Sequence, residues 1–220
     1  VNDEARSMFE REARILARLR HPNIVNVVDF GIDSDGSYVL VMDQVPGSDL
    51  GKWAGFRYRS QQGMPVDLAV HIAIEVLDAL HYAHELRDGQ GNMVSVIHRD
   101  ISPSNILLET TGRVYVVDFG IARSETEHTK TSQAQFKGKF AYMAPELLAK
   151  PVPYPGLDVY STALCLYEIL AGGNPFRTQD PQITLARVLQ HVPPSLSTVR
   201  SDVPQGLSDL LDRSLAKDPR

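Results

Sequence analysis

Three short polar motifs follow one another in the second half of the sequence, and their order constrains the fold more than any other feature. Residues 98–105 read His-Arg-Asp-Ile-Ser-Pro-Ser-Asn, and they are followed by Asp118-Phe119-Gly120 and Ala144-Pro145-Glu146. Any three-residue piece is common by chance, whereas the ordered set is not. Asn105 and Asp118 each stand at one end of a short β-like run, so we expect both side chains to point into one cleft.

Hydrophobic periodicity predicts one helix and a little sheet at the start of the chain, followed by a mostly helical region. The first helix, residues 3–20, has an apolar stripe that includes Met8, Phe9 and Leu16. The sequence therefore predicts an α+β fold with a truncated small mixed lobe at 1–45, a hinge near 43–47 and a large mainly helical lobe at 46–220. The other predicted elements are strands at 24–30, 38–42, 94–97, 106–108 and 113–117, a short helix after Asp49, and helices at 66–87, 145–149, 158–171, 181–190 and 205–216.

Composition and charge narrow the classes of protein to which the chain can belong. The net charge is −5, which disfavours a nucleic-acid-binding surface. No apolar run approaches the roughly 20 residues that span a bilayer, so we expect no membrane segment in these residues. The single cysteine, Cys165, excludes an intrachain disulfide and fits a reducing compartment such as the cytoplasm.

The motif set resembles the H-R-D-x-x-x-x-N, D-F-G and A-P-E pattern of eukaryotic-type protein kinases, and the resemblance covers essentially the whole chain. The Ser102-Pro103 variant and the long polar loop at 87–95 are similar to a subset of bacterial serine/threonine kinases. The resemblance implies a transferase with ATP and Mg²⁺ (or Mn²⁺) as cofactors and protein Ser/Thr hydroxyls as acceptors, acting in signalling. It also implies a two-lobed fold.

The chemistry of phosphoryl transfer explains the residue types in the motifs. Metal ions neutralise charge on the nucleotide phosphates, and a carboxylate orients the attacking hydroxyl. The resemblance assigns the metal to Asn105 and Asp118 and the role of catalytic base to Asp100. A second Val-Val-Asp-Phe-Gly string surrounds Asp29, but no catalytic loop precedes it, so we expect Asp29 to be a solvated strand-end residue.

The resemblance also implies residues around the nucleotide. Glu12 matches the helix carboxylate that pairs with the ATP-binding lysine. The alternative is a surface helix charge, but Glu12 lies on the same stripe as Phe9 and Leu16, which favours the pairing role. Asp49 matches an acid near the ribose, but it is also a good helix N-cap. The remaining implied contacts to ATP are Met42 at the rear of the adenine pocket, backbone groups of Asp43 and Val45, and Leu107 against the adenine face.

Two further groups of residues follow from the resemblance. His98, Phe119, Leu16 and Val27 match a stacked apolar column through the active site. Asp158 resembles a buried acid that braces the catalytic loop; the simpler interpretation is a plain N-cap, and the two roles are compatible.

Regulation is implied by Arg99, which marks kinases controlled by phosphorylation of the activation segment. Within the polar stretch 124–135, the distance to Gly138 favours Thr131 or Ser132 as the phosphorylated residue. The alternative is that these are ordinary solvated loop hydroxyls.

The sequence departs from the family pattern at two catalytic positions. A lysine normally follows the catalytic aspartate by two residues, but here that residue is Ser102. A threonine normally follows the glycine before A-P-E, but here it is Lys139. We therefore predict that the two have exchanged places and that Lys139 reaches Asp100. The alternative is that Lys139 is solvated or favours acidic substrates.

The glycine-rich loop and the ATP-binding lysine of the family would precede Val1, and the arginine that pairs with Glu146 would follow Arg220. We therefore expect the 220 residues to be a fragment that is inactive alone, with Glu146 lacking its usual partner. The rival from another class is a pseudokinase that acts as a binding or scaffold module, which the retained Asp100, Asn105 and Asp118 disfavour. A small-molecule phosphotransferase is disfavoured by the A-P-E segment.

Overall fold

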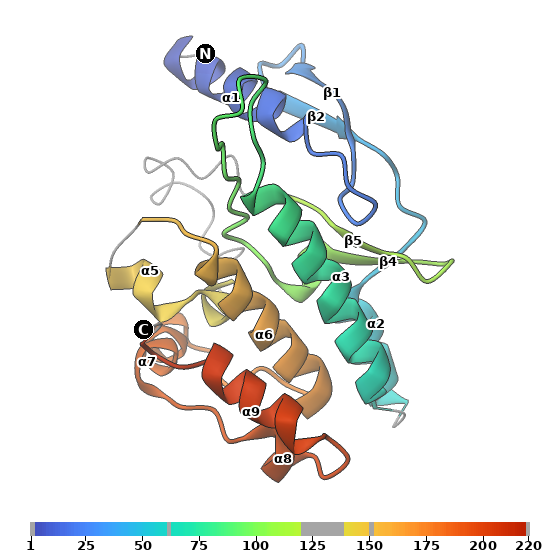
Figure 1. Ribbon diagram of the computed structural model, residues 1–220, viewed down its shortest axis with the longest axis vertical. Coiled ribbons are helices and arrows are strands. Elements are labelled where there is room, and N and C mark those ends of the chain that lie inside the picture. The colour runs from blue at the N-terminus through green and yellow to red at the C-terminus, as the bar shows by residue number, and fades with distance from the viewer. Residues whose placement is uncertain (1–2, 61–62, 120–138, 150–151, 219–220) are drawn as a thin grey trace.

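The computed structural model describes residues 3–60, 63–119, 139–149 and 152–218. One end of the molecule contains helix α1 (Asp3–Leu16) and two strands, and the other end is built mainly of helices, as Figure 1 shows. The predicted α+β class is confirmed. The elements that follow α1 are β1 (Val27–Ile32), β2 (Tyr38–Met42), β3 (Gly47–Asp49), α2 (Leu50–Arg59), α3 (Val66–His84), η1 (Pro103–Asn105), β4 (Ile106–Glu109), β5 (Val114–Val116), η3 (Phe140–Tyr142), α5 (Pro145–Ala149), α6 (Gly156–Ala171), α7 (Pro181–Gln190), α8 (Leu196–Val199) and α9 (Gln205–Ser214).

Helix α1 packs on the antiparallel pair β1–β2 through one apolar face. Ala13 and Leu16 are buried, and the Phe9 ring stacks on Tyr38 with ring centroids 4.6 Å apart. Met8, which the periodicity placed on the same stripe, is 37% exposed, so that part of the prediction is wrong. The helix also ends at Leu16, four residues before the predicted end, because the chain continues in turns toward Pro22.

The second sheet connects the two ends of the molecule and positions the polar motifs. Strands β3, β4 and β5 are antiparallel neighbours in that order, and Leu107 stands opposite both Asp49 and Tyr115. The segment after α1 joins the sheet, since Val25 N donates to Val116 O (3.2 Å) and Val116 N donates to Asn23 O (2.8 Å). The ends of β4 and β5 thereby acquire a fixed position beside α1.

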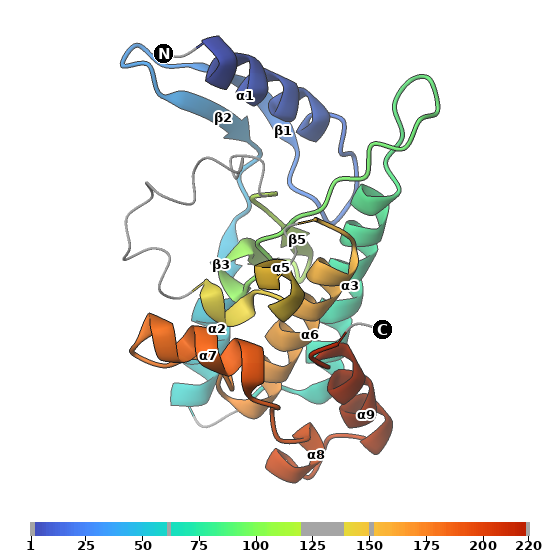
Figure 2. The ribbon, with the colours of Figure 1, turned by 90° about the vertical axis from the view of Figure 1, so that its left-hand side faces the viewer.

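The helical end has a continuous core in which α3 packs against α6. Helix α6 is buried along most of its length, and its apolar side chains meet the alanine-rich face of α3. Figure 2 shows α3 and α6 lying side by side, with α9 and α8 at the end farthest from α1. Burial on this scale makes α6 a rigid support for the segments attached to it.

Several predicted boundaries differ from the structure. Residues 94–97 form no strand; the backbone there is tied to the end of α3, with Val94 N donating to Leu86 O (2.7 Å) and Val96 N to Ala83 O (2.9 Å). The short elements β3 and α8 were not predicted, because three or four residues carry too little periodicity. The division of the chain at residues 45 and 46 stays a prediction. In the part of the chain that the structure describes, no helix has both the length and the apolar character needed to cross a membrane.

Candidate active site

One buried carboxylate, that of Asp158, holds the start of the 98–105 segment. Its Oδ2 accepts a hydrogen bond from His98 N and its Oδ1 accepts one from Arg99 N, both at 2.8 Å. The ring Nε2 of His84, on α3, lies 2.8 Å from the same Oδ2. Asp158 is fully buried in the first turn of α6, where the helix dipole favours a negative charge. The predicted brace is confirmed, and the N-cap alternative is wrong, because Pro155 is the N-cap of this helix.

The backbone of this segment is unusual at the point where Asp158 grips it. Arg99 has φ 63°, a left-handed conformation that costs free energy for a residue with a side chain. The two hydrogen bonds to Asp158 offset that cost. Arg99 lines a small cavity beside Glu12 and Phe119, whereas Asp100 lines a different cavity.

The predicted contact between His98 and Phe119 is present. Their ring centroids lie 4.6 Å apart, and His98 Nε2 is 2.9 Å from Val117 O, to which it donates. Burial lowers the pKa of the His98 imidazole, and the nearby Asp158 charge only partly opposes this. The histidine is therefore a neutral packing residue. Leu16, Val27 and Phe119 line one cavity, and a continuous stack of all four residues stays a prediction.

The Asp100 carboxylate is surrounded by donors from two segments of the chain. Asn105 Nδ2 donates to Asp100 O (2.9 Å) and to Asp100 Oδ2 (3.2 Å). Lys139 Nζ forms an ion pair with the same Oδ2. Ser102 Oγ, by contrast, lies 2.9 Å from Ser104 Oγ and is buried within the loop. The structure therefore brings Lys139 and Asp100 together and directs Ser102 into the loop.

Asp118 and Asn105 stand at neighbouring ends of paired strands. Asn105 precedes β4, Asp118 follows β5, and Val117 N donates to Asn105 O at 3.0 Å. Asp118 is exposed and, with φ 58°, also adopts a left-handed conformation that turns its side chain out of the strand. A carboxylate and an amide oxygen at this edge are hard ligands of the kind that Mg²⁺ takes from a protein, one or two at a time. The residues present thus fit a Mg²⁺ or Mn²⁺ ion.

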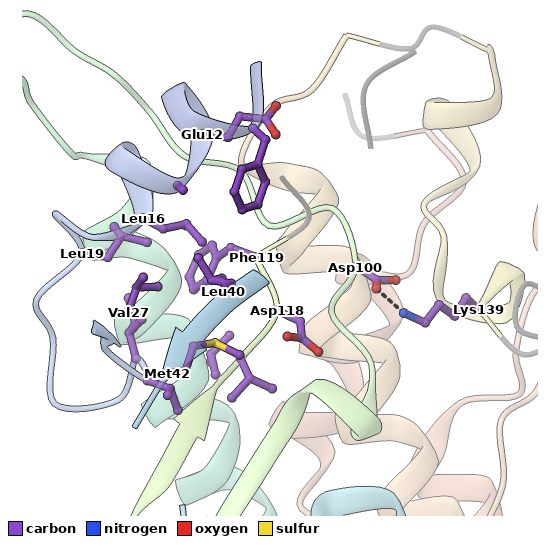
Figure 3. Close-up of a pocket in the computed structure, with 16 residues that line it drawn as sticks. Glu12, Leu16, Leu19, Val27, Leu40, Met42, Asp100, Asp118, Phe119 and Lys139 are labelled. Atoms are coloured by element: carbon purple, nitrogen blue, oxygen red, sulfur yellow. Dashed lines mark hydrogen bonds and ion pairs between the residues drawn. The ribbon is translucent and has the colours of Figure 1, made fainter. Parts of the chain in front are cut away.

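A cavity of about 350 Å³ lies between α1, the β1–β2 pair and these motifs. Figure 3 shows Asp118 and Asp100 on one side and an apolar wall opposite, with the dashed line marking the pair of Asp100 and Lys139. One end of the cavity is apolar, and the other end carries the Asp100 and Asp118 carboxylates together with Lys139. Its labelled lining residues are Glu12, Leu16, Leu19, Val27, Leu40, Met42, Asp100, Asp118, Phe119 and Lys139.

Four of the residues implied to contact ATP lie outside this cavity lining: Asp43, Val45, Asp49 and Leu107. Asp43 N donates to Asn26 O at 3.1 Å, so the backbone group that it can offer a ligand is its carbonyl. Asp49 caps α2, with its Oδ1 accepting from Lys52 N at 2.9 Å and its Oδ2 pairing with Lys52 Nζ at 2.9 Å. The N-cap interpretation of Asp49 is therefore confirmed, and its contact with ribose stays a prediction.

Asp29 and the regulatory residues have separate positions. Asp29 is exposed inside β1 opposite Val41, rather than at a strand end, and its Oδ1 accepts from Phe30 N at 2.8 Å. It is not part of the cavity lining among the described residues. Arg99 is exposed. Thr131 and Ser132 lie outside the described residues.

Sequence reasoning missed the anchor that positions Lys139. Tyr142 Oη donates to Glu168 Oε2 at 2.5 Å, and Ser161 Oγ donates to Tyr142 O at 2.8 Å. The Arg177 guanidinium lies over the Tyr142 ring, 5.4 Å from its centroid, and pairs with Glu168 at 3.3 Å. The only local signal is a tyrosine near the A-P-E motif, because its partners are up to 35 residues away in the sequence.

Glu146 has a partner that the sequence did not indicate. Tyr154 Oη donates to Glu146 Oε1 at 2.5 Å. Desolvation, followed by this hydrogen bond, raises the pKa of Tyr154 to about 12. Glu146 therefore pairs with a tyrosine in the described residues, and the prediction about its usual arginine partner stays untested.

The protein kinase domain model matches residues 1–220. The chain belongs to the protein kinase family. Relatives similar to it include the tyrosine-protein kinase MasK of Myxococcus xanthus, 34% identical over 99% of this chain and 34% of that protein. The probable serine/threonine-protein kinase PknB of Lactococcus lactis is 32% identical over 99% of this chain and 32% of that protein. The serine/threonine-protein kinase PrkC of Bacillus subtilis is 31% identical over 96% of this chain and 31% of that protein.

These findings confirm the family predicted from the motif set, together with its two-part α+β fold and its bacterial affinity. Membership implies use of ATP and a divalent metal in general. The chain spans about a third of the length of the relatives that it matches, so the activity, substrates and partners of a whole protein are a matter for proposal.

Proposed function

We propose that this chain is the catalytic part of a protein serine/threonine kinase, which transfers the γ-phosphate of ATP to Ser or Thr hydroxyls of protein substrates. The observation that carries the proposal is the arrangement of Asp100, Asn105 and Asp118. Asn105 is hydrogen-bonded to Asp100, and its backbone is bonded to the residue before Asp118. The proposed base and the two proposed metal ligands thus belong to one hydrogen-bonded unit, which supports the proposal.

In the transfer step the substrate hydroxyl oxygen forms a bond to the γ-phosphorus. The bond from that phosphorus to the β–γ bridging oxygen breaks, ADP leaves, and the hydroxyl proton passes to the Asp100 carboxylate. Asp100 orients the hydroxyl, and Asn105 orients Asp100 through its 3.2 Å contact to Oδ2. Positioning of this kind supplies most of the catalysis in phosphoryl transfer.

Asp118 and Asn105 would hold Mg²⁺ or Mn²⁺, which would neutralise charge on the phosphates. Met42, Asp43, Val45 and Leu107 would contact the adenine and Asp49 the ribose. Glu12 would pair with a lysine that holds the phosphates. Of these, Glu12 and Met42 line the cavity, which supports their assignment.

The proposal extends to regulation and location. Phosphorylation of Thr131 or Ser132 would add about −1.5 to −2 charge, with which the Arg99 guanidinium would pair. The catalytic part would act in the cytoplasm, in signalling, with ATP and protein substrates as its partners and no nucleic acid.

A pair of aspartate variants tests the proposal in the protein as its gene encodes it. Asp118→Asn should abolish phosphorylation of a generic protein substrate, whereas Asp29→Asn, in the same local Val-Val-Asp-Phe-Gly sequence, should change it less than about twofold. The assay measures transfer of labelled γ-phosphate from ATP with Mg²⁺. Equal losses in both variants would refute the metal assignment. An inactive wild-type protein that still binds ATP would favour the pseudokinase.

The acceptor is tested in the same reaction. Because one relative is named a tyrosine-protein kinase, the phosphorylated product should be hydrolysed and its phosphoamino acids separated. Phosphoserine and phosphothreonine are the expected products. Phosphotyrosine as the main product would overturn the proposed acceptor and leave the kinase activity standing.

A further inference from the structure

The cation beside the reacting groups comes from outside the 98–105 segment. We infer that Lys139 supplies the positive charge that holds Asp100 in position and stabilises the transferring phosphate, and that Ser102 in the catalytic loop leaves this role to it. The inference rests on the proposed function and goes beyond it by assigning a charge-stabilising residue outside the catalytic loop.

The first support is the contact itself. Lys139 Nζ pairs with Asp100 Oδ2, the oxygen that Asn105 Nδ2 also approaches. The Asp100 side chain is 11% exposed and that of Lys139 is 37% exposed. The pair is thus shielded on the carboxylate side, where screening by water is weaker than at an open surface.

The second support is the balance of charge in the cavity. Glu12, Asp100 and Asp118 place three carboxylates on its lining. Lys139 is the one lysine or arginine among the lining residues that the structure describes. An anionic nucleotide bound there would face those carboxylates, so a cation at the site of transfer has a strong electrostatic effect.

The third support is the rigid backbone next to Lys139. Lys139 is the N-cap of η3, and the following Ala141 and Tyr142 are buried. Tyr142 is bonded to Ser161 and Glu168 of α6. A side chain that begins three residues from such an anchor is preorganised, and preorganised charge costs no rearrangement during the reaction.

Ser102 carries no positive charge, and its side chain is directed into the loop. Ser102 is 4% exposed, and its Oγ lies 2.9 Å from Ser104 Oγ rather than at Asp100. The other cation of the 98–105 segment, Arg99, lines a different cavity with Ile15 and Ser95. Lys139 therefore fills a role that the loop leaves open.

The test measures kcat and KM for ATP in the protein as its gene encodes it. Lys139→Thr should lower kcat about 100-fold and change KM for ATP less than about threefold, because the lost charge acts on the transferring phosphate. Lys139→Arg should retain at least about a tenth of the wild-type kcat. Arg213→Thr, which removes one positive charge from exposed α9, should match the wild type.

The double variant Ser102→Lys/Lys139→Thr decides whether the two positions have exchanged roles. The kcat of the double variant should be at least about tenfold higher than that of Lys139→Thr, since coupled residues give non-additive effects. An unchanged or increased kcat in Lys139→Thr would overturn the inference, the increase indicating that the ion pair blocks Asp100. If the effects of the two substitutions on kcat are strictly additive and the double variant keeps the melting temperature of the wild type, the two positions have not exchanged roles.

Two controls separate this result from other failures. If the wild type transfers phosphate and Lys139→Thr equals it, this inference fails and the proposed function stands. If the wild type and Asp118→Asn are equally inactive, the proposed function fails and takes this inference with it. Acidic and neutral peptide substrates are compared last. If Lys139→Thr only raises KM for acidic peptides, Lys139 selects substrates and the inference is overturned.

Discussion

Replacing Asp158 by asparagine removes the brace of the catalytic loop while keeping the size and shape of the side chain. The carboxylate accepts from His98 N and Arg99 N at 2.8 Å and contacts His84 Nε2 at 2.8 Å. An asparagine has one acceptor oxygen, so its amide nitrogen would face one of the two backbone N–H groups. One buried donor would lose its partner.

The cost follows from the burial of the site. A hydrogen bond to a charged acceptor contributes about 1.5–3 kcal/mol, and leaving its donor unsatisfied in a buried site adds to the loss, so we expect the free energy of unfolding to fall by about 3 kcal/mol. For a domain of this size that corresponds to a decrease of about 6–12 °C in the melting temperature. Because Arg99 at φ 63° depends on this brace, Asp100 should also shift, and a displacement of about 1 Å lowers kcat about 100-fold.

The measurement combines thermal unfolding with phosphoryl transfer in the protein as its gene encodes it. Asp67→Asn is the matched control, because Asp67 also lies in the first turn of a helix but is exposed and accepts from Leu68 N. Its effect should stay within about 0.5 kcal/mol. If Asp158→Asn has the melting temperature and kcat of Asp67→Asn, the brace has no energetic importance and the reasoning is refuted.

Two further predictions concern the supports of the helical end. Tyr142→Phe should lower the free energy of unfolding, measured by urea denaturation, by about 1–2 kcal/mol, because it removes the hydrogen bond to Glu168. The control Tyr38→Phe, whose ring stacks on Phe9 near the surface, should change that free energy little. Burial lowers the pKa of Lys217 to about 8. Between about pH 8 and 10 the Lys217 amine is therefore protonated in the unfolded chain but largely neutral in the folded chain. Because the unfolded chain binds more protons in this window, Lys217 makes the free energy of unfolding rise with pH there. The melting temperature of the wild type minus that of Lys217→Met should increase from pH 8 to 10, and a flat difference would contradict the assignment.

The sequence predicted the long elements because each has a clear apolar period. Helices α3 and α6 and strand β2 appear close to their expected bounds, whereas β1, predicted at 24–30, runs from Val27 to Ile32. The segment 94–97 was misassigned because its apolar residues alternate as in a strand, but its backbone bonds go to the end of α3. Local periodicity does not distinguish a strand from a loop that packs against a helix.

Site residues were predictable where the chemistry requires a particular residue type within a motif. They were less predictable where tertiary contacts determine which side chains meet. The pairing of Lys139 with Asp100 followed from two departures whose chemistry is complementary. The contacts of His84 and Arg177 were not predicted, because their partners lie 74 and 35 residues away in the sequence. Tyr154 lies only 8 residues from Glu146, but no motif links the two. Each is a polar group whose partner is chosen by burial in the folded chain.

One helix supports both segments that carry the reacting groups. Asp158 grips the loop that bears Asp100, while Ser161 and Glu168 hold Tyr142, three residues after Lys139. At about 100° per residue these α6 positions fall within roughly 80° of one another, so they share a face of the helix. Because α6 is buried on both sides, two segments 39 residues apart in sequence are fixed to a single rigid body. The meeting of Lys139 and Asp100 is therefore determined by the spacing of side chains along α6 as well as by the attraction between the two charges.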